Sequence, residues 1–375
     1  MPNRPSIPDN IKLKLWVLSG GRCEFPGCNE YIWRDGLTLK EDNFAHMAHI
    51  TAFSPDGPRG DIELSEEMAK DFDNLMLVCV KHSKLIDGRN HGDYLKEDLQ
   101  GYKKAHEDRI RRQTDLQPNH KTTVLRFMAN IGDRAVTVPV SDAYHAILPK
   151  FPADDRGILL NFTDRPGRGK ENFWKSCADD IVTQVERGLA SGNDREQPSH
   201  ISIFALGPIP LLMKLGHAVG NTISADLYQR HRDTENWEWK PENDEPFDYN
   251  VREALEKDSK DIALVLSLSG KIHEDEVYKV FQNRPHLYEI SIESPTPSFL
   301  SQKSRLEKFR EKYRSLLSMI RDKHGGDVKI HLFPAIPAPV AVLCGRELLP
   351  KSDPTLVVYD HEKDKDGFIP ILTIN

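Results

Sequence analysis

The chain lacks long hydrophobic runs. No apolar stretch reaches the roughly 18 to 20 residues that a helix needs to span a bilayer, so we expect no membrane segment. The N-terminal stretch MPNRPSIPDN has no apolar core of the kind found in secretion signals. Cysteine is scarce as well, and its odd count of five fits a compartment where thiols stay reduced. Together these absences predict a cytoplasmic protein.

Positive charge is also in short supply. Asp and Glu number 58 against 51 Lys and Arg, which gives a formal net charge of -7 at pH 7. This balance argues against a protein that coats nucleic acid by bulk attraction, but it permits nucleic acid held locally by a metal and a few cations. With 375 residues, 38% of them hydrophobic and 29% charged, the chain is expected to form two globular domains.

Residues 1–113 are predicted to form the first domain. Residues 11–20, IKLKLWVLSG, are typical of a short helix ended by a Gly-Gly pair, and residues 94–113 show helical spacing of apolar residues. Between these helices, residues 22–93 are rich in Gly, Pro, His and Asp and contain only short apolar runs. A segment of this kind needs a staple. The polar residues that come next indicate a linker and lead-in over residues 114–150.

Two spaced pairs of metal-ligating residues supply a candidate staple. Cys23 and Cys28 flank a Pro-Gly turn in RCEFPGCNEY, and Cys79 and His82 follow an apolar run in LMLVCVKH. Three thiolates and one imidazole suit a tetrahedral Zn²⁺ ion. The zinc would be structural, because protein would fill all four positions. The alternative is that these residues are unrelated buried cysteines and an incidental histidine.

The residues between the two pairs suggest phosphodiester chemistry. Hydrolysis needs a base that is neutral near pH 7, which a His provides, and a hard cation such as Mg²⁺. The pattern AHI…GPRGD…DNLMLVCVKH…LID resembles the ββα-metal motif of HNH endonucleases, and the match covers roughly the first 110 residues. The resemblance implies an α+β, zinc-stapled nuclease domain in which His49 is the general base and Asn74 positions it.

The ligands of the catalytic Mg²⁺ are less clearly marked. Many HNH relatives carry a second His directly after the zinc-binding one, whereas this chain has Ser83 there. Asp87 follows one helical turn later and would face the same way, so it is the predicted metal ligand, with His46 as a weaker candidate. Asp87 could instead cap a turn with Gly88, and His46 could merely pack.

Residues 151–375 are predicted to form a second, α/β domain. Strand-like apolar runs alternate with helix-like segments, which indicates a largely parallel sheet. The stretch IFALGPIPLLMKLG also aligns without a gap on LFPAIPAPVAVLCG, and each copy then leads to a strand with a Tyr. The aligned identical pairs are Phe204 and Phe333, Pro208 and Pro337, Pro210 and Pro339, and Gly216 and Gly345. Two similar units, over about 151–245 and 258–375, are therefore expected around a pseudo-two-fold axis, unless the similarity is due to chance.

Candidate ligand contacts come from two sources. In SADLYQRHRDTENWEW, indoles would stack on bases and Arg side chains would grip phosphates, although the Trp pair could equally close the core. The other candidates follow apolar strands, where α/β sheets bind ligands. The full set is Pro208, Tyr228, Gln229, Arg230, Arg232, Trp237, Trp239, Ser267, Ser269, Gly270, Lys271, Pro334 and Ala335.

The pattern HISIFALGPIPLLMKLG followed by LYQRHR and two Trp resembles the SAVED domain, a cyclic-oligonucleotide sensor built of two fused CARF-like, Rossmann-like units. An HNH domain joined to a SAVED domain resembles the effector nuclease of CBASS anti-phage immunity. The resemblance implies a cyclic dinucleotide (cGAMP-like) or other cyclic oligonucleotide as ligand, oligomerisation from dimer to tetramer on activation, and degradation of double-stranded DNA.

Two other functions remain open on the sequence. One is a constitutive HNH restriction-type endonuclease whose second domain reads DNA. The other is a non-enzymatic nucleotide sensor whose zinc module is only structural, and Ser83 is its best support.

Overall fold

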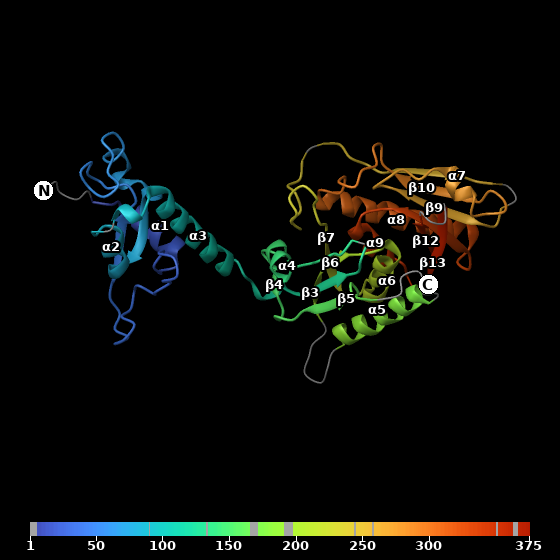
Figure 1. Cartoon of the computed structure of the whole chain (residues 1–375), viewed down its shortest axis with the longest axis horizontal. Coiled ribbons are helices and arrows are strands. Elements are labelled where there is room, and N and C mark those ends of the chain that lie inside the picture. The colour runs from blue at the N-terminus through green and yellow to red at the C-terminus, as the bar shows by residue number, and fades with distance from the viewer. Residues whose placement is uncertain are drawn as a thin grey trace. The chain divides into compact units, whose positions relative to one another are not determined.

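The computed structural model describes residues 6–89, 91–132, 134–165, 172–190, 198–243, 245–256, 259–349, 352–362 and 367–375. The chain divides into two compact units, the first ending at Gln117 and the second beginning at Pro118 (Figure 1). No helix in these described ranges is long and apolar enough to cross a membrane.

The first unit is built around a two-stranded sheet. β1 (Ala45–His49) pairs antiparallel with β2 (Leu75–Cys79), so that His49 lies opposite Leu75. All five residues of β2 are buried. α2 (Val80–Ile86) begins at the residue after β2, which gives a strand, strand and helix in succession.

Helices surround this small sheet. α1 (Asp9–Ser19) is followed by its C-cap Gly20, as the sequence predicts. The φ of Gly20, 61°, lies in the left-handed region that favours glycine. α3 (Lys96–Thr114) matches the second predicted helix and packs against α1. The short 3-10 helices are η1 (Glu67–Lys70), η2 (Phe72–Asn74) and η3 (His91–Asp93).

The second unit contains two sheets, as an α/β fold with alternating strands and helices predicts. The first sheet has five strands in the order β4-β3-β6-β7, with β5 also paired to β3, and all its pairings are parallel. Its strands are β3 (Lys121–Met128), β4 (Phe151–Pro152), β5 (Ile158–Asn161), β6 (His200–Leu206) and β7 (Ser224–Tyr228).

The second sheet has six strands in the order β13-β12-β11-β9-β10-β8. Its inner pairings are parallel, and the two edge strands pair antiparallel. Its strands are β8 (Asn250–Ala254), β9 (Ile262–Ser267), β10 (His286–Ser291), β11 (Lys329–Ala335), β12 (Thr355–Glu362) and β13 (Gly367–Ile374).

Two equivalent helices join the sheets. α6 (Ile209–Val219) follows β6, α9 (Ala338–Arg346) follows β11, and the two helices pack against each other. α9 contacts β6 and β7 of the first sheet, while α6 contacts β12 and β13 of the second, and Figure 1 shows both helices between the sheets. This reciprocal packing confirms the predicted internal repeat. The remaining helices are α4 (Val140–Ala146), η4 (Pro118–His120), α5 (Phe173–Leu189), α7 (Glu274–Tyr278) and α8 (Lys303–His324).

The predicted start of the second domain at residue 151 is wrong. Residues 114–150 contain β3 and α4, and β3 lies in the middle of the first sheet, between β4 and β6. The polar, Pro-containing composition that indicates a linker ends at about His120. In the following KTTVLRFM, buried residues alternate with partly exposed ones over most of the strand, as they do when one face of a strand is covered more fully than the other.

Candidate functional site

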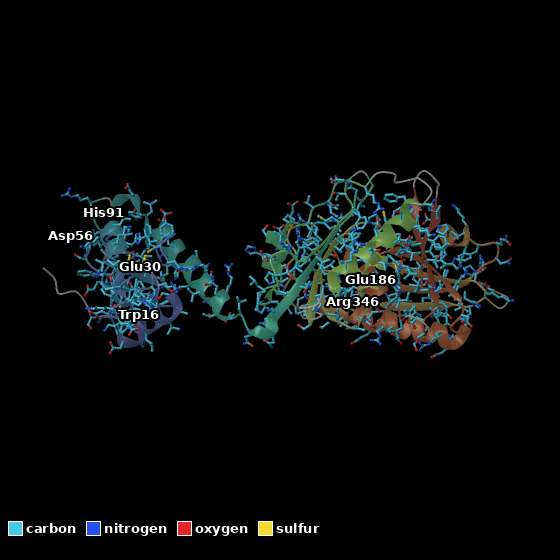
Figure 2. The ribbon with its side chains drawn as sticks, turned by 90° about the horizontal axis from the view of Figure 1, so that it is seen from below. Trp16, Glu30, Asp56, His91, Glu186 and Arg346 are labelled. Carbon is cyan, nitrogen blue, oxygen red and sulfur yellow. The ribbon has the colours of Figure 1, made fainter. Side chains whose placement is uncertain are left out.

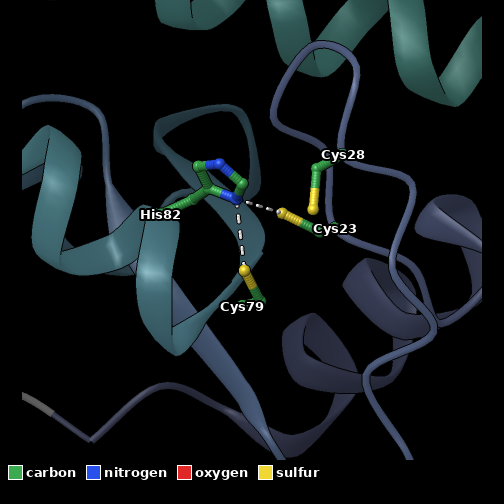
Figure 3. Close-up of side chains that lie close together, drawn as sticks. All are labelled: Cys23, Cys28, Cys79 and His82. Atoms are coloured by element: carbon green, nitrogen blue, oxygen red, sulfur yellow. Dashed lines mark hydrogen bonds between the residues drawn. The ribbon is translucent and has the colours of Figure 1, made fainter. Parts of the chain in front are cut away.

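The four predicted zinc ligands converge in the first unit. The ligand atoms of Cys23, Cys28, Cys79 and His82 all lie within 4.8 Å of one another (Figure 3). His82 Nδ1 is 3.6 Å from Cys23 Sγ and 3.2 Å from Cys79 Sγ. In a tetrahedral zinc site, sulfur and nitrogen ligands are about 3.5 Å apart, given metal distances of about 2.3 and 2.0 Å. The donor set and its spacing therefore fit Zn²⁺.

Local structure explains the convergence. Cys79 is the N-cap of α2, which places His82 in the first turn of that helix. The other two ligands flank a turn in which Gly27 has a φ of 77°. The His82 ring stacks on Phe25, with centroids 4.2 Å apart and planes within 7°. Burial raises the pKa of the Cys23 and Cys79 thiols, so their thiolate forms require a nearby cation.

His49 is held in one orientation at the end of β1. Its side chain is buried, and Nε2 lies 3.0 Å from the carbonyl oxygen of Ala69. A carbonyl can only accept, so Nε2 donates the hydrogen. In the neutral imidazole the lone pair then lies on Nδ1. This is the tautomer that a general base acting through Nδ1 requires.

Asn74 fixes both segments that hold His49. It is fully buried, its Oδ1 accepts from Thr51 N at 2.7 Å, and its Nδ2 donates to Thr51 O at 2.9 Å and Met68 O at 3.1 Å. Thr51 follows His49 by two residues, and Met68 precedes Ala69. One amide side chain therefore ties the end of β1 to the carbonyl that orients the imidazole, as the predicted positioning role requires.

Arg59 is a site residue that the sequence analysis missed. Its side chain is only 9% exposed, and its φ of 57° is left-handed. It donates to Ile50 O at 2.7 Å, Ile86 O at 2.8 Å and His49 O at 3.4 Å. Its Nη2 also lies 2.7 Å from Asp87 Oδ1. Arg59 thus joins the end of β1 to the end of α2, and its place in the GPRGD loop was the available signal.

The two predicted Mg²⁺ ligands have different surroundings. Asp87 is the C-cap of α2 and is paired with Arg59 through Oδ1. His46 is exposed and stands three residues before His49 on β1, so strand alternation directs the two side chains to opposite faces. Within the described residues, the Cys23–Cys28–Cys79–His82 set is the one group of three or more metal-ligating side chains that comes together. The assignment of Asp87 as the catalytic metal ligand, with His46 as the weaker candidate, therefore stays a prediction.

The structure brings together the ligand candidates in the second half of the second unit. Ser269, Gly270 and Lys271 follow β9, and Pro334 and Ala335 end β11. The backbone N–H groups of Leu268 and Ser269 donate to Ala335 O at 3.0 and 2.7 Å. These residues therefore share the carboxyl edge of two neighbouring parallel strands.

Several predicted ligand contacts are instead structural. Ser267 is buried, and its hydroxyl donates to Glu289 at 3.0 Å and accepts from Ile272 N at 3.3 Å. Tyr228 and Trp237 are 6% and 1% exposed, and both rings pack on Phe204, one stacked and one edge-on. Ser267, Tyr228 and Trp237 therefore belong to the core. For Trp237 this is the alternative that the sequence left open.

The candidates around the end of β7 are more varied. Pro208 is the buried N-cap of α6, Arg230 lies 3.8 Å from Asp142, and Arg232 is exposed. Among the described residues, four buried polar atoms without a hydrogen-bond partner gather between residues 229 and 239. They are Gln229 Oε1, His231 Nε2, Trp237 Nε1 and Trp239 Nε1.

Such atoms are costly to bury unpaired and are rare in folded proteins. His231, which the sequence analysis missed, is 6% exposed and packs edge-on against Trp239. The segment after β7 therefore offers an unusual density of hydrogen-bonding groups that the chain itself does not satisfy.

Comparison with known proteins identifies the second unit. The SAVED family, described as the "SMODS-associated and fused to various effectors sensor domain", matches residues 181–374. No curated protein sequence matches the chain. The first unit lies outside the matched residues.

The comparison with solved structures found SAVED/CARF-domain containing receptors called Cap4. The Acinetobacter baumannii receptor with the cyclic trinucleotide 3'3'3'-cAAA is 14% identical, with a TM-score of 0.44, over 84% of this chain and 68% of that chain. The same receptor with 2'3'3'-cAAA is 15% identical, with a TM-score of 0.44 over 84% and 67%. The Moraxella osloensis receptor is 13% identical, with a TM-score of 0.41 over 84% and 66%. Because the family match extends over more than half of the chain, this protein belongs to the SAVED family, and its second unit is a SAVED sensor domain.

Proposed function

We propose that the protein is a metal-dependent HNH endonuclease that a cyclic oligonucleotide activates, and that it degrades double-stranded DNA in CBASS-type anti-phage defence. The observation that carries the nuclease part is the fixed tautomer of His49, held through Ala69 and Asn74 at the end of β1. Membership of the SAVED family supports the sensing part.

Zinc would hold the nuclease unit together. The four ligands join the turn before Tyr31 to the start of α2, in a unit whose sheet has only two strands. A small unit of this kind gains much of its folding free energy from a structural metal. The zinc has no catalytic step, because four protein ligands leave no open position.

The chemistry would centre on His49. Nδ1 accepts the proton of the attacking water, while Nε2–H keeps its hydrogen bond to Ala69 and stabilises the ring orientation of the imidazolium that forms. Asp87, whose side chain is 40% exposed, would help hold a Mg²⁺ ion. When bound, Mg²⁺ supplies positive charge that stabilises the phosphate and the leaving oxygen.

The regulatory ligand would bind at the carboxyl edges of the sensor strands. The unpaired atoms of Gln229, His231 and Trp239 match the donors and acceptors on base edges, and the exposed Arg232 suits a phosphate. A cyclic oligonucleotide, such as a cGAMP-like dinucleotide, presents bases and phosphates together. It activates by binding an oligomeric state more tightly than the free chain, since a ligand shifts an equilibrium only by its difference in affinity.

Two variants test the nuclease assignment. His49→Ala should abolish cleavage of plasmid in Mg²⁺ and cyclic oligonucleotide, whereas His91→Ala, an exposed histidine of the same unit that Figure 2 labels, should cleave like the wild type. Cleavage by His49→Ala at the wild-type rate would remove the assignment. A thermal-shift screen of cyclic di- and trinucleotides tests the sensing part separately, because a tight ligand raises the unfolding temperature.

A further inference from the structure

A cavity lies inside the SAVED unit, apart from the proposed ligand edge. Its volume is about 150 Å³, and its walls come from the start of β7, the first turns of α8 and the end of α9. None of the ligand candidates that follow β6, β7, β9 or β11 is among the described residues that line this cavity. The cavity is therefore a separate place in the fold.

Arg346, the last residue of α9, is the most buried cation in its wall. It is 7% exposed, and its Nη2 donates to Ile223 O at 2.8 Å. Its Nη1 is also buried but finds no hydrogen-bond partner in the described chain. Figure 2 labels Arg346 among the side chains of this unit. A buried guanidinium with an unsatisfied donor is destabilising unless an acceptor reaches it.

The two buried carboxylates near the cavity are already neutralised. Asp226 Oδ2 lies 2.8 Å from Lys150 Nζ, and its Oδ1 lies 2.6 Å from Lys303 Nζ. Glu347 lies 2.7 Å from Arg310 Nε and 3.5 Å from Arg314 Nε. Because each carboxylate is already paired with two cations, these contacts do not balance the positive charge of Arg346.

Glu347 adds a second requirement. Its side chain is 2% exposed, and its Oε2 makes the 3.5 Å ion contact with Arg314 but no hydrogen bond within the described residues. A molecule that satisfies both neighbours must offer an acceptor to Arg346 and a donor to Glu347. A hydrogen phosphate group has both, because one of its oxygens carries a proton near neutral pH. Sulfate and phosphodiesters carry only acceptors at that pH.

We propose that this cavity binds inorganic hydrogen phosphate, at a site separate from that of the cyclic oligonucleotide. Arg346 Nη1 donates to one phosphate oxygen, and Lys303 and Arg310 of α8 balance the charges of Asp226 and Glu347, which would otherwise repel the anion. Glu347 accepts from the protonated oxygen. The volume suits a single phosphate group, whereas a cyclic oligonucleotide is far larger.

Calorimetric titration of the full-length protein with inorganic phosphate, sulfate and adenosine 5'-monophosphate at constant ionic strength tests this site. Phosphate should saturate one site per chain, and sulfate should bind at least tenfold more weakly. Adenosine 5'-monophosphate should also bind more weakly than phosphate, because most of a monoester carries no proton on its phosphate oxygens at pH 7. Tighter binding of the monophosphate than of phosphate would contradict the proposed contact with Glu347. Equal affinity for sulfate, or no saturable phosphate binding, would overturn the proposal.

Variants assign the binding to this cavity. Arg346→Gln should weaken phosphate binding at least tenfold. Arg310→Gln, which changes a 42%-exposed side chain, should weaken it by a similar factor and provides the test if Arg346→Gln does not fold. Lys323→Gln is the matched control, since it alters a 41%-exposed cation at the other end of α8 that does not line the cavity. Equal phosphate affinity in the wild type and Arg310→Gln would place the binding elsewhere and contradict the assignment.

Discussion

Gly216 of α6 and Gly345 of α9 occupy reciprocal positions where the two halves of the sensor meet. A Cβ atom on Gly216 would lie 1.9 Å from Val342 O, and one on Gly345 would lie 1.9 Å from Met213 O. Met213 precedes Val342 by the same number of residues as Gly216 precedes Gly345. The two halves therefore contact each other through equivalent atoms, as units related by a pseudo-two-fold axis must.

Replacing either glycine by alanine should destabilise the sensor unit. The methyl group would meet backbone carbonyls, which cannot move without separating α6 from α9. Overpacking of this kind costs about 1 to 3 kcal/mol or more. Chemical denaturation of Gly345→Ala measures the loss, with Gly326→Ala as a control because its nearest atom is 3.7 Å away. Equal stability of the two variants would show that the helices are not so tightly opposed.

Metal content should follow the four converging ligands. Purified protein should contain one zinc per chain. Cys79→Ala should lose it and unfold the first unit, because the four ligands hold the turn that carries Cys23 and Cys28 against the start of α2. Elemental analysis and far-ultraviolet circular dichroism provide the measurements. Cys177→Ala removes a buried thiol of the second unit and should keep full zinc content. Retention of zinc by Cys79→Ala would exclude the four-ligand site.

The stability of the sensor unit should depend on pH through Asp226. Burial raises the pKa of this carboxyl, but hydrogen bonds from His200, Lys150 and Lys303 outweigh burial and hold the pKa below its usual 3.8. A lowered folded-state pKa means that the stabilisation is fully present above the unfolded-state value and is lost as the pH falls below it. Asp226→Asn should therefore be less stable than the wild type at pH 7, and the difference should shrink below about pH 4.

Urea denaturation of both proteins between pH 7 and pH 3 provides the comparison. Asp248→Asn is a suitable control, since that carboxylate is 68% exposed and pairs with Lys312 at the surface. A stability difference for Asp226→Asn that stays constant down to pH 3 would be inconsistent with an ionised, paired Asp226.

Arg59 should matter for catalysis more than for DNA binding. A lysine has a single ammonium group and cannot reproduce contacts to His49, Ile86 and Asp87 at once. The resulting shift of the imidazole should lower kcat by about 10- to 100-fold, the loss expected for a displacement near 1 Å. The two effects are separated by measuring the single-turnover cleavage rate and the DNA affinity of Arg59→Lys. Arg34→Lys, which changes an exposed arginine of the same unit, is the control. Weakened DNA binding with unchanged kcat would assign Arg59 to the DNA interface instead.

Sequence patterns predicted the features that depend on local spacing. Cys23, Cys28, Cys79 and His82 stand beside turns and at a helix start, so their convergence was readable from sequence. The repeated Phe, Pro and Gly positions likewise predicted two equivalent strand-to-helix units. Within each ligand pair and within each strand-to-helix unit the geometry is short-range, and the order of residues specifies it directly.

Features that depend on tertiary burial were not readable in this way. Trp237 lies in a polar segment, yet it packs on Phe204 from β6. Arg59 becomes a buried clamp only because the ends of β1 and α2 lie together. β3 follows a linker-like segment and becomes a central strand because β5 and β6 flank it. In each case a distant segment decides what the local residues do.

The central claim is that a cyclic oligonucleotide at the SAVED unit controls cleavage by His49. The most direct test is the rate of plasmid cleavage in Mg²⁺ with and without the cyclic oligonucleotide that the thermal-shift screen identifies. The account predicts slow or no cleavage by the protein alone and rapid cleavage when the ligand is added. Cleavage at the same rate in both conditions would contradict it and indicate a constitutive nuclease.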